Sequence, residues 1–186
     1  MDAVTKHPDR FERAVIVDTG PFDYYDMQKF PITQQTQSHV YKLGRVPTKG
    51  RTYSEIKQDV SGIVGGDESL IGFFMTNLVP DETIEANGGK GRRGWRWRVN
   101  YGALSRGYYD GLKYQFGGGG KVFRGPVLLM LGTRSAYIDL NELECFERIF
   151  PDVDLERDVV EFDSDHWIHI EKPVEFMDAF KEFDES

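Results

Sequence analysis

The stretch that decides the fold is "DVVEFDSDHWIHIEKPVEFMDAF", residues 158–180. It opens with a short apolar run that ends at Phe162, a pattern typical of a buried strand. An amphipathic stretch with apolar residues at helical spacing begins at Pro173, and "DHWIH", with His166 and His169, lies between the two. The stretch therefore predicts a strand, a loop that carries a histidine, and a helix. One face of that helix would hold five apolar residues, Val174, Phe176, Met177, Phe180 and Phe183.

Two further stretches predict strands of the same kind. Residues 13–18, "RAVIVD", are followed at once by the turn residues "TGP", and residues 125–135, "GPVLLMLGTRS", carry an apolar run between two glycines. Residues 139–150 predict a helix that Pro151 ends. The C-terminal part of the chain thus alternates strand, helix, strand and helix. This order predicts an α/β fold with a parallel sheet covered by helices.

The middle of the chain, residues 25–124, is polar and different in character. Short helices are predicted around Tyr53–Ile63 and Ser69–Leu78. Because this segment is inserted between two strands of one sheet, we expect it to form a lid over the strand ends. The predicted organisation is therefore a first strand region in 1–24, a lid in 25–124, and two strands with their helices in 125–186.

The composition limits the classes of function. The 186 residues suffice for one domain with a core, and the formal net charge of −8 argues against a nucleic-acid-binding protein. The longest apolar run, "VLLML" at 127–131, is far too short for a transmembrane helix. A single cysteine, Cys145, excludes an internal disulfide.

Two motif-like stretches receive structural interpretations. Residues 117–121, "GGGGK", lack the first glycine and the hydroxyl residue that a phosphate-binding loop requires, so they predict an ordinary loop. Residues 91–98, "GRRGWRWR", mix arginine with tryptophan as single-stranded nucleic-acid sites do. The acidic chain has no second basic cluster, and this favours a lid element whose aromatic rings pack inward.

His166 is the candidate general base. It follows a predicted strand directly, at the edge where parallel α/β sheets bind their ligands, and imidazole exchanges protons near neutral pH. A purely structural histidine remains an alternative. A metal site with His169 and the nearby aspartates is not predicted, because no distant group of ligands accompanies them, and no cofactor is expected.

An acid should orient the histidine, and Asp18 ends the first strand at the same edge of the sheet. A turn or helix-cap role for Asp18 is the alternative. Asp139 lies further from its strand, and Asp163 and Asp165 are too close in sequence to His166 to reach its ring easily.

No nucleophile is evident. The chain contains no G-x-S-x-G, and "ALSRG" around Ser105 lacks the first glycine and a preceding strand. Cys145 lies on the packing side of a predicted helix. Ser135 follows the second strand without the glycines of a nucleophile turn, so we expect it to offer a hydrogen bond rather than to attack.

Taken together, these stretches resemble one family. "HPDRFERAVIVDTGPFDY" (7–24) resembles the sixth strand of an α/β-hydrolase, and "WRWRVNYGAL" (95–104) resembles a lid helix. "GPVLLMLGTRSAYI" (125–138) and "FPDVDLERDVVEFDSDHWIHIEKPVEF" (150–176) resemble the seventh strand, the eighth strand and the catalytic histidine loop. The branch is that of bacterial small-acyl esterases and mitochondrial α/β-hydrolase-domain proteins of animals.

The resemblance implies a role for particular residues. His166 matches the triad histidine, Asp18 the triad acid, and Ser135 a serine that supports the triad. An apolar acyl site would be shaped by three tryptophans, Trp95, Trp97 and Trp167. The chain departs from the family where Asp163, Ser164 and Asp165 replace small residues before the histidine.

The family order is serine, acid, histidine, and these residues hold the last two. The resemblance therefore predicts the C-terminal part of a serine hydrolase for small ester or lipid substrates, inactive without its nucleophile half. Two alternatives are a non-catalytic relative that binds a protein partner through an exposed strand edge, and a fold with a vestigial site. With one strand edge unpaired, the isolated chain is expected to be marginally stable or prone to aggregate.

Overall fold

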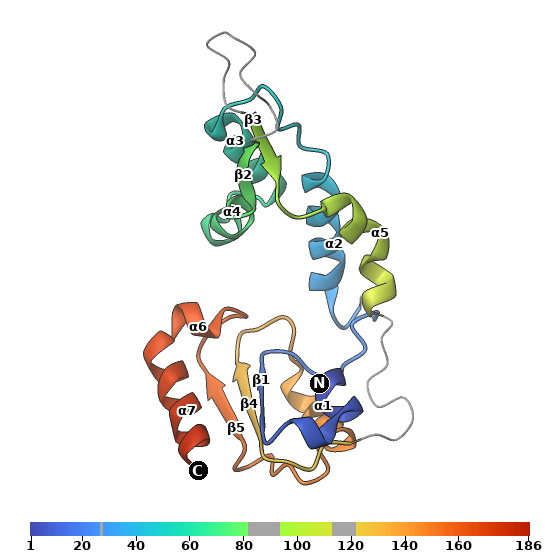
Figure 1. The fold of residues 1–186 in the computed structure, drawn as a ribbon, viewed down its shortest axis with the longest axis vertical. Coiled ribbons are helices and arrows are strands. Elements are labelled where there is room, and N and C mark those ends of the chain that lie inside the picture. The colour runs from blue at the N-terminus through green and yellow to red at the C-terminus, as the bar shows by residue number, and fades with distance from the viewer. Residues whose placement is uncertain (27, 82–93, 113–121) are drawn as a thin grey trace. The chain divides into compact units, whose positions relative to one another are not determined.

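The computed structural model describes residues 1–26, 28–81, 94–112 and 122–186 (Figure 1). They divide into two compact units: Met1–Ile32 with Lys113–Ser186, and Thr33–Leu112. The first unit holds the parallel sheet, and the second holds a group of helices with a two-stranded hairpin. The predicted loop at 117–121 and the first three residues of the 91–98 stretch lie outside the described residues.

The sheet of the first unit has the predicted strands in the order β1-β4-β5. β1 (Ala14–Val17), β4 (Val127–Gly132) and β5 (Val159–Phe162) are parallel, with Ala14 opposite Val127 and Leu129 opposite Val159. Every residue of the central strand β4 is buried, because both faces of the sheet are covered. The predicted α/β class is confirmed.

One face of the sheet is covered by two short helical segments, α1 (Asp2–Lys6) and η2 (Leu140–Arg148). Ile16 and Leu129 pack there against Phe146 and Phe150. A third segment, η1 (Pro8–Arg10), buries no residue. The helix predicted over 139–150 is present as a 3-10 helix. The Asp139 side chain caps its start by accepting the Asn141 N–H at 3.0 Å. Glu142 has non-helical angles (φ −124°, ψ 27°), which interrupts the segment with a kink.

The other face is covered by α6 (Ile168–Glu171) and α7 (Pro173–Glu185), the red helices of Figure 1. Phe176 and Phe183 pack with Leu128 and Met130. Of the five apolar residues predicted on one side of α7, three remain exposed: Val174, Met177 and Phe180 are 66%, 45% and 39% exposed. They lie beside the contact face rather than on it.

The second unit contains four helices and one hairpin among its described residues. These elements are α2 (Pro31–Leu43), α3 (Tyr53–Ile63), α4 (Glu68–Met75), β2 (Leu78–Asp81), β3 (Gly94–Trp97) and α5 (Tyr101–Leu112). The helix predicted at 53–63 is present because Thr52 and Glu55 form a reciprocal capping box at its start. Its buried residues, Ile56 and Val60, join a core of their own.

The segment 95–104, which resembled a lid helix, is only partly helical. Trp95 and Trp97 lie on β3, paired antiparallel with β2, and the helix begins at Tyr101. Alternating aromatic residues suit a strand better than a helix, since every second side chain points to the same face. Among the described helices, none is long and apolar enough to cross a membrane.

Candidate active site

Three predicted site residues meet at the carboxyl edge of the sheet. Asp18 directly follows β1, Ser135 lies in the loop after β4, and His166 lies in the loop after β5. The His166 Nδ1 lies 2.7 Å from the Asp18 Oδ2, and the Ser135 hydroxyl donates to the same oxygen. Residues more than 100 positions apart in the sequence therefore form one hydrogen-bonded cluster, because parallel strands bring their carboxyl ends together.

Asp18 is fully buried, and its carboxylate is satisfied on both oxygens. The Gly132 N–H donates to Oδ1 at 2.8 Å, while Oδ2 accepts from Ser135 and His166. A buried carboxylate without such donors would be strongly unfavourable. The donation from Nδ1 also sets the tautomer of a neutral His166: Nε2 is then the unprotonated nitrogen, which can accept a proton.

The Asp18 backbone is strained. Its φ of 45° is the one positive value among the described non-glycine residues. Aspartate tolerates this left-handed region better than most residues, but such a conformation costs about 1–3 kcal/mol when the surroundings impose it. This left-handed conformation directs the carboxylate at the end of β1 toward Gly132, Ser135 and His166.

The histidine loop passes very close to the end of β4. A Cβ on Gly132 would lie 2.6 Å from the Asp165 carbonyl oxygen and 2.8 Å from that of Ser164. The Arg134 N–H donates to the Ser164 carbonyl at 3.1 Å, which ties the two loops together. Only glycine permits this approach, and the fully buried Ser164 shows why a small residue is needed in the histidine loop.

Arg134 balances the carboxylates that depart from the family pattern. Its guanidinium bonds to Asp163, lies 3.5 Å from the Asp165 Oδ1, and donates to Glu171 at 3.1 Å. Glu171 in turn accepts the Asp165 N–H at 3.1 Å. Arg134 was not predicted, and the only signal for it was a histidine loop rich in acids with no cation of its own.

Aromatic rings surround His166, whose side chain is 36% exposed. The Tyr137 ring lies 4.4 Å from the imidazole centre, tilted by 40°, and the Trp167 ring lies at 5.4 Å. Trp167 also contacts the ring of His169 at 6.0 Å. Nothing in the sequence around Tyr137 indicates that its ring lies beside His166, because the contact joins the loops after two different strands.

Trp95 and Trp97 belong to the second unit and pack within it. The Trp95 ring lies 5.5 Å from Tyr53 and the Trp97 ring 5.3 Å from Tyr101. Burial raises the pKa of Tyr101 to about 12. The role of Trp95 and Trp97 in an acyl site, like that of Trp167, stays a prediction.

The other residues considered as nucleophiles are poorly placed. Ser105 lies inside α5, where a regular helix allows no sharp nucleophile turn. Burial raises the pKa of the Cys145 thiol to about 11, so it is not a ready thiolate. Among the described residues, no group of three or more histidine, cysteine, aspartate and glutamate side chains could hold a metal ion.

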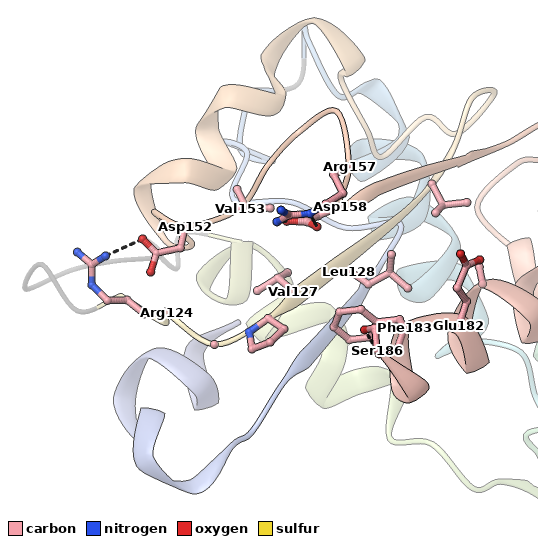
Figure 2. A pocket seen from close by; sticks show the side chains of 14 residues that line it. Arg124, Val127, Leu128, Asp152, Val153, Arg157, Asp158, Glu182, Phe183 and Ser186 are labelled. Atoms are coloured by element: carbon pink, nitrogen blue, oxygen red, sulfur yellow. Dashed lines mark hydrogen bonds and ion pairs between the residues drawn. The ribbon is translucent and has the colours of Figure 1, made fainter.

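A pocket of about 560 Å³ lies at the opposite, amino end of the strands (Figure 2). It is lined by Val127 on β4, Phe183 on α7 and two arginines. Arg124 pairs with Asp152 and Arg157 with Asp158, both at 2.7 Å. The pocket thus sets two arginines against three side-chain carboxylates, those of Asp152, Asp158 and Glu182, and it shares no lining residue with the histidine cluster.

Comparison with known proteins identifies relatives of similar sequence. No protein-family model matches the chain. It is 28% identical over 184 residues to the "sn-1-specific diacylglycerol lipase ABHD11" of Danio rerio, covering 98% of the chain and 52% of that protein. It is also 28% identical, over 187 residues, to the protein of the same name from Xenopus laevis, covering 100% of the chain and 54% of that protein. The chain thus spans about half the length of these curated relatives.

A third relative is an "abhydrolase domain-containing protein" of Schizosaccharomyces pombe, 25% identical over 184 residues, of which the chain covers 62%. Among solved structures, a "Marine microorganism esterase" superposes with a TM-score of 0.79 at 21% identity, over 97% of this chain and 63% of that one. An "E-2-(Acetamidomethylene)succinate Hydrolase" superposes with a TM-score of 0.65 at 17% identity, over 100% of this chain and 62% of that one. At such identities the structural likeness concerns the fold.

Proposed function

We propose, from the premise that the chain belongs to the α/β-hydrolase fold family, that it supplies the acid and base of a serine hydrolase for carboxylic esters or acylglycerols. The observation that carries the proposal is the hydrogen bond of 2.7 Å between the Asp18 Oδ2 and the His166 Nδ1. It leaves Nε2 on the partly exposed side of the imidazole as the proton acceptor.

In the proposed reaction, a serine from outside these residues lies within hydrogen-bond reach of the His166 Nε2. The serine oxygen attacks the acyl carbon as Nε2 takes its proton, and the proton then passes to the leaving alcohol. Water attacks the acyl-serine by the same route, which releases the carboxylic acid and restores the serine. Asp18 holds the imidazole in one tautomer and stabilises the imidazolium that forms twice in each cycle.

The choice of substrate class is supported by what the relatives are named for. Two of them are named as diacylglycerol lipases and one structural neighbour as an esterase. Because the chain spans about half of the curated relatives, the activity of a whole protein is itself part of the proposal. An ester or lipid substrate is a small molecule, and no cofactor takes part in the steps above.

The open edge of β1 is where we propose that the nucleophile segment joins the sheet. Among the described strands, β1 pairs only with β4. The Ala14 N–H bonds to Pro126, just before β4, and that of Asp18 to Met130 in β4, so by alternation the N–H groups of Val15 and Val17 point away from this neighbour. A parallel strand added at this edge would bring its carboxyl end, and a serine there, toward Asp18 and His166.

A chimera tests the proposal. It joins the part of the Danio rerio relative that lies outside the matched region to this chain, and hydrolysis of a p-nitrophenyl ester is measured for the chimera and for the chain alone. The proposal expects turnover by the chimera and none by the chain. A folded but inactive chimera would contradict it, as would activity of the chain alone that Ser105→Ala abolishes.

A further inference from the structure

The loops that follow β1 and β4 are joined by one hydroxyl group. The Tyr24 Oη accepts the Gly20 N–H at 3.0 Å and donates to the Tyr137 carbonyl at 2.9 Å. Gly20 lies two residues after Asp18, and Tyr137 lies two residues after Ser135. The Tyr24 hydroxyl therefore connects the loop that carries the acid to the loop that carries its supporting serine.

Tyr137 closes this connection on the other side. Its N–H donates to the Ser135 Oγ at 3.1 Å, and the Ser135 hydroxyl donates to Asp18. Its ring lies 4.4 Å from the centre of the His166 imidazole. Tyr137 thus contacts two members of the cluster, the serine through its amide and the histidine through its ring, and it contacts Tyr24 through its carbonyl.

The Tyr24 side chain is held in place by aromatic packing. Its ring packs against Phe30, with the ring centres 5.0 Å apart, and against Phe22 at 6.0 Å in an edge-to-face arrangement. A Cβ on Gly20 would lie 2.4 Å from the Phe22 ring, so a larger residue there would have to displace that ring. Burial raises the pKa of Tyr24, and its hydroxyl remains protonated and able to donate at neutral pH.

The imidazole needs such a contact. The bond from Nδ1 to Asp18 fixes one atom of the ring, but a ring held at one atom can still tilt, and the side chain is 36% exposed. The ring of Tyr137 limits that tilt from one side. Its own place depends on its backbone, which Tyr24 holds through the carbonyl.

We propose that Tyr24 is a positioning residue for His166 and acts through Tyr137. Tyr24 fixes the Tyr137 backbone, and the Tyr137 ring then holds the imidazole plane in line with Asp18. The inference rests on the proposed role of His166 as the base. The positioning role thus falls to two uncharged tyrosines, Tyr24 and Tyr137, that take no part in the proton transfer.

The proton on Nδ1 of His166 reports on this arrangement in the chain as it is. It should give a downfield NMR resonance, and its exchange with water measures how often the bond to Asp18 opens. Tyr24→Phe removes both hydrogen bonds of the hydroxyl, and loss of the one to the Tyr137 carbonyl, at ordinary net strength, should speed this exchange roughly fivefold, with the circular dichroism unchanged. Tyr41→Phe, an exposed tyrosine of the other unit, is the matched control and should leave the rate unchanged.

A second pair of variants distinguishes the effect of the Tyr137 ring from the effect of the Tyr137 backbone. Tyr137→Leu removes the ring beside His166 and should also speed the exchange, whereas Tyr137→Phe keeps the ring and should not. An unchanged rate in Tyr24→Phe, or equal rates in the two Tyr137 variants, would overturn the inference. Absence of the resonance from the unmodified chain would overturn the Asp18–His166 pair itself, and with it both this inference and the proposed function.

Discussion

The two ends of the parallel strands both carry acids and bases, but they hold them differently. At the carboxyl end, Asp18 is fully buried and accepts hydrogen bonds from three residues, Gly132 and Ser135 at the end of β4 and His166 after β5. At the amino end, Arg124 pairs with Asp152 and Arg157 with its neighbour Asp158, and both arginines are largely exposed. Groups that the fold gathers at a buried point have fixed geometry, whereas exposed pairs are screened by water. This difference is why we place the chemistry at the carboxyl end.

The largest expected effect on stability comes from Asp18→Ala. It leaves the buried Gly132 N–H and the Ser135 hydroxyl without their acceptor, at roughly 1–3 kcal/mol for each unpaired group. Asp152→Ala at the amino end should change the free energy of unfolding by less than about 1 kcal/mol. Urea unfolding of both variants measures the difference. Equal losses would remove the distinction between the two ends.

Gly132→Ala should come next. The added methyl group would meet backbone carbonyl oxygens of the histidine loop, and such crowding typically lowers the free energy of unfolding by about 1–3 kcal/mol. A Cβ on Gly62 in α3 would enter open space, with nothing outside its own helix within 4 Å, so Gly62→Ala should instead stabilise by about 0.5–1 kcal/mol. Thermal melts of the pair, with the Nδ1 resonance of His166 as a local probe, distinguish crowding from a general effect. A neutral Gly132→Ala would show that the two loops are not held in close contact.

A smaller, pH-dependent effect is expected at the amino end. The hydrogen bond from Arg157 lowers the pKa of Asp158 in the folded chain. The group therefore stabilises the fold above its ordinary pKa of about 4, and this contribution is lost as the pH falls through the lower folded value. Asp158→Asn should reduce the loss of unfolding free energy between pH 7 and pH 3. An identical pH dependence in the two proteins would exclude this contribution.

A substitution away from both ends of the parallel strands shows how little an exposed site contributes to the free energy of unfolding. Met177→Lys on α7 replaces an exposed apolar side chain, so it should alter the free energy of unfolding by no more than about 0.5 kcal/mol. The same change should reduce the self-association expected of a chain with an open strand edge and exposed apolar residues. Size-exclusion chromatography at several concentrations measures this. A parent chain that is monomeric throughout, with cooperative unfolding, would contradict the expectation of aggregation.

Much of the sheet could be predicted because its signals are local. The runs in β1, β4 and β5 are short, apolar and bounded by glycine, proline or acidic residues, and the structure places each strand inside its predicted range. The meeting of Asp18 with His166 followed from one rule, that parallel strands end at a common edge. No spacing along the chain was needed for that step.

The remainder depends on contacts between distant residues. The roles of Tyr24, Tyr137 and Arg134 arise from loops brought together only in the folded chain, and aromatic or basic residues in loops give no local signal of this kind. The exposure of Met177 could not be predicted either. Helical periodicity identifies an apolar side of a helix but not how much of that side its neighbours cover.

The most direct test of the central claim compares two histidines three residues apart. In the ester-hydrolysing chimera, His166→Ala should lower kcat/KM by roughly 10³–10⁴-fold, as expected for loss of a triad base. His169→Ala should leave it within about threefold, because His169 contacts Trp167 and Phe176 rather than Asp18. A His166→Ala chimera that hydrolyses the ester as fast as its parent would contradict the claim that this histidine is the catalytic base.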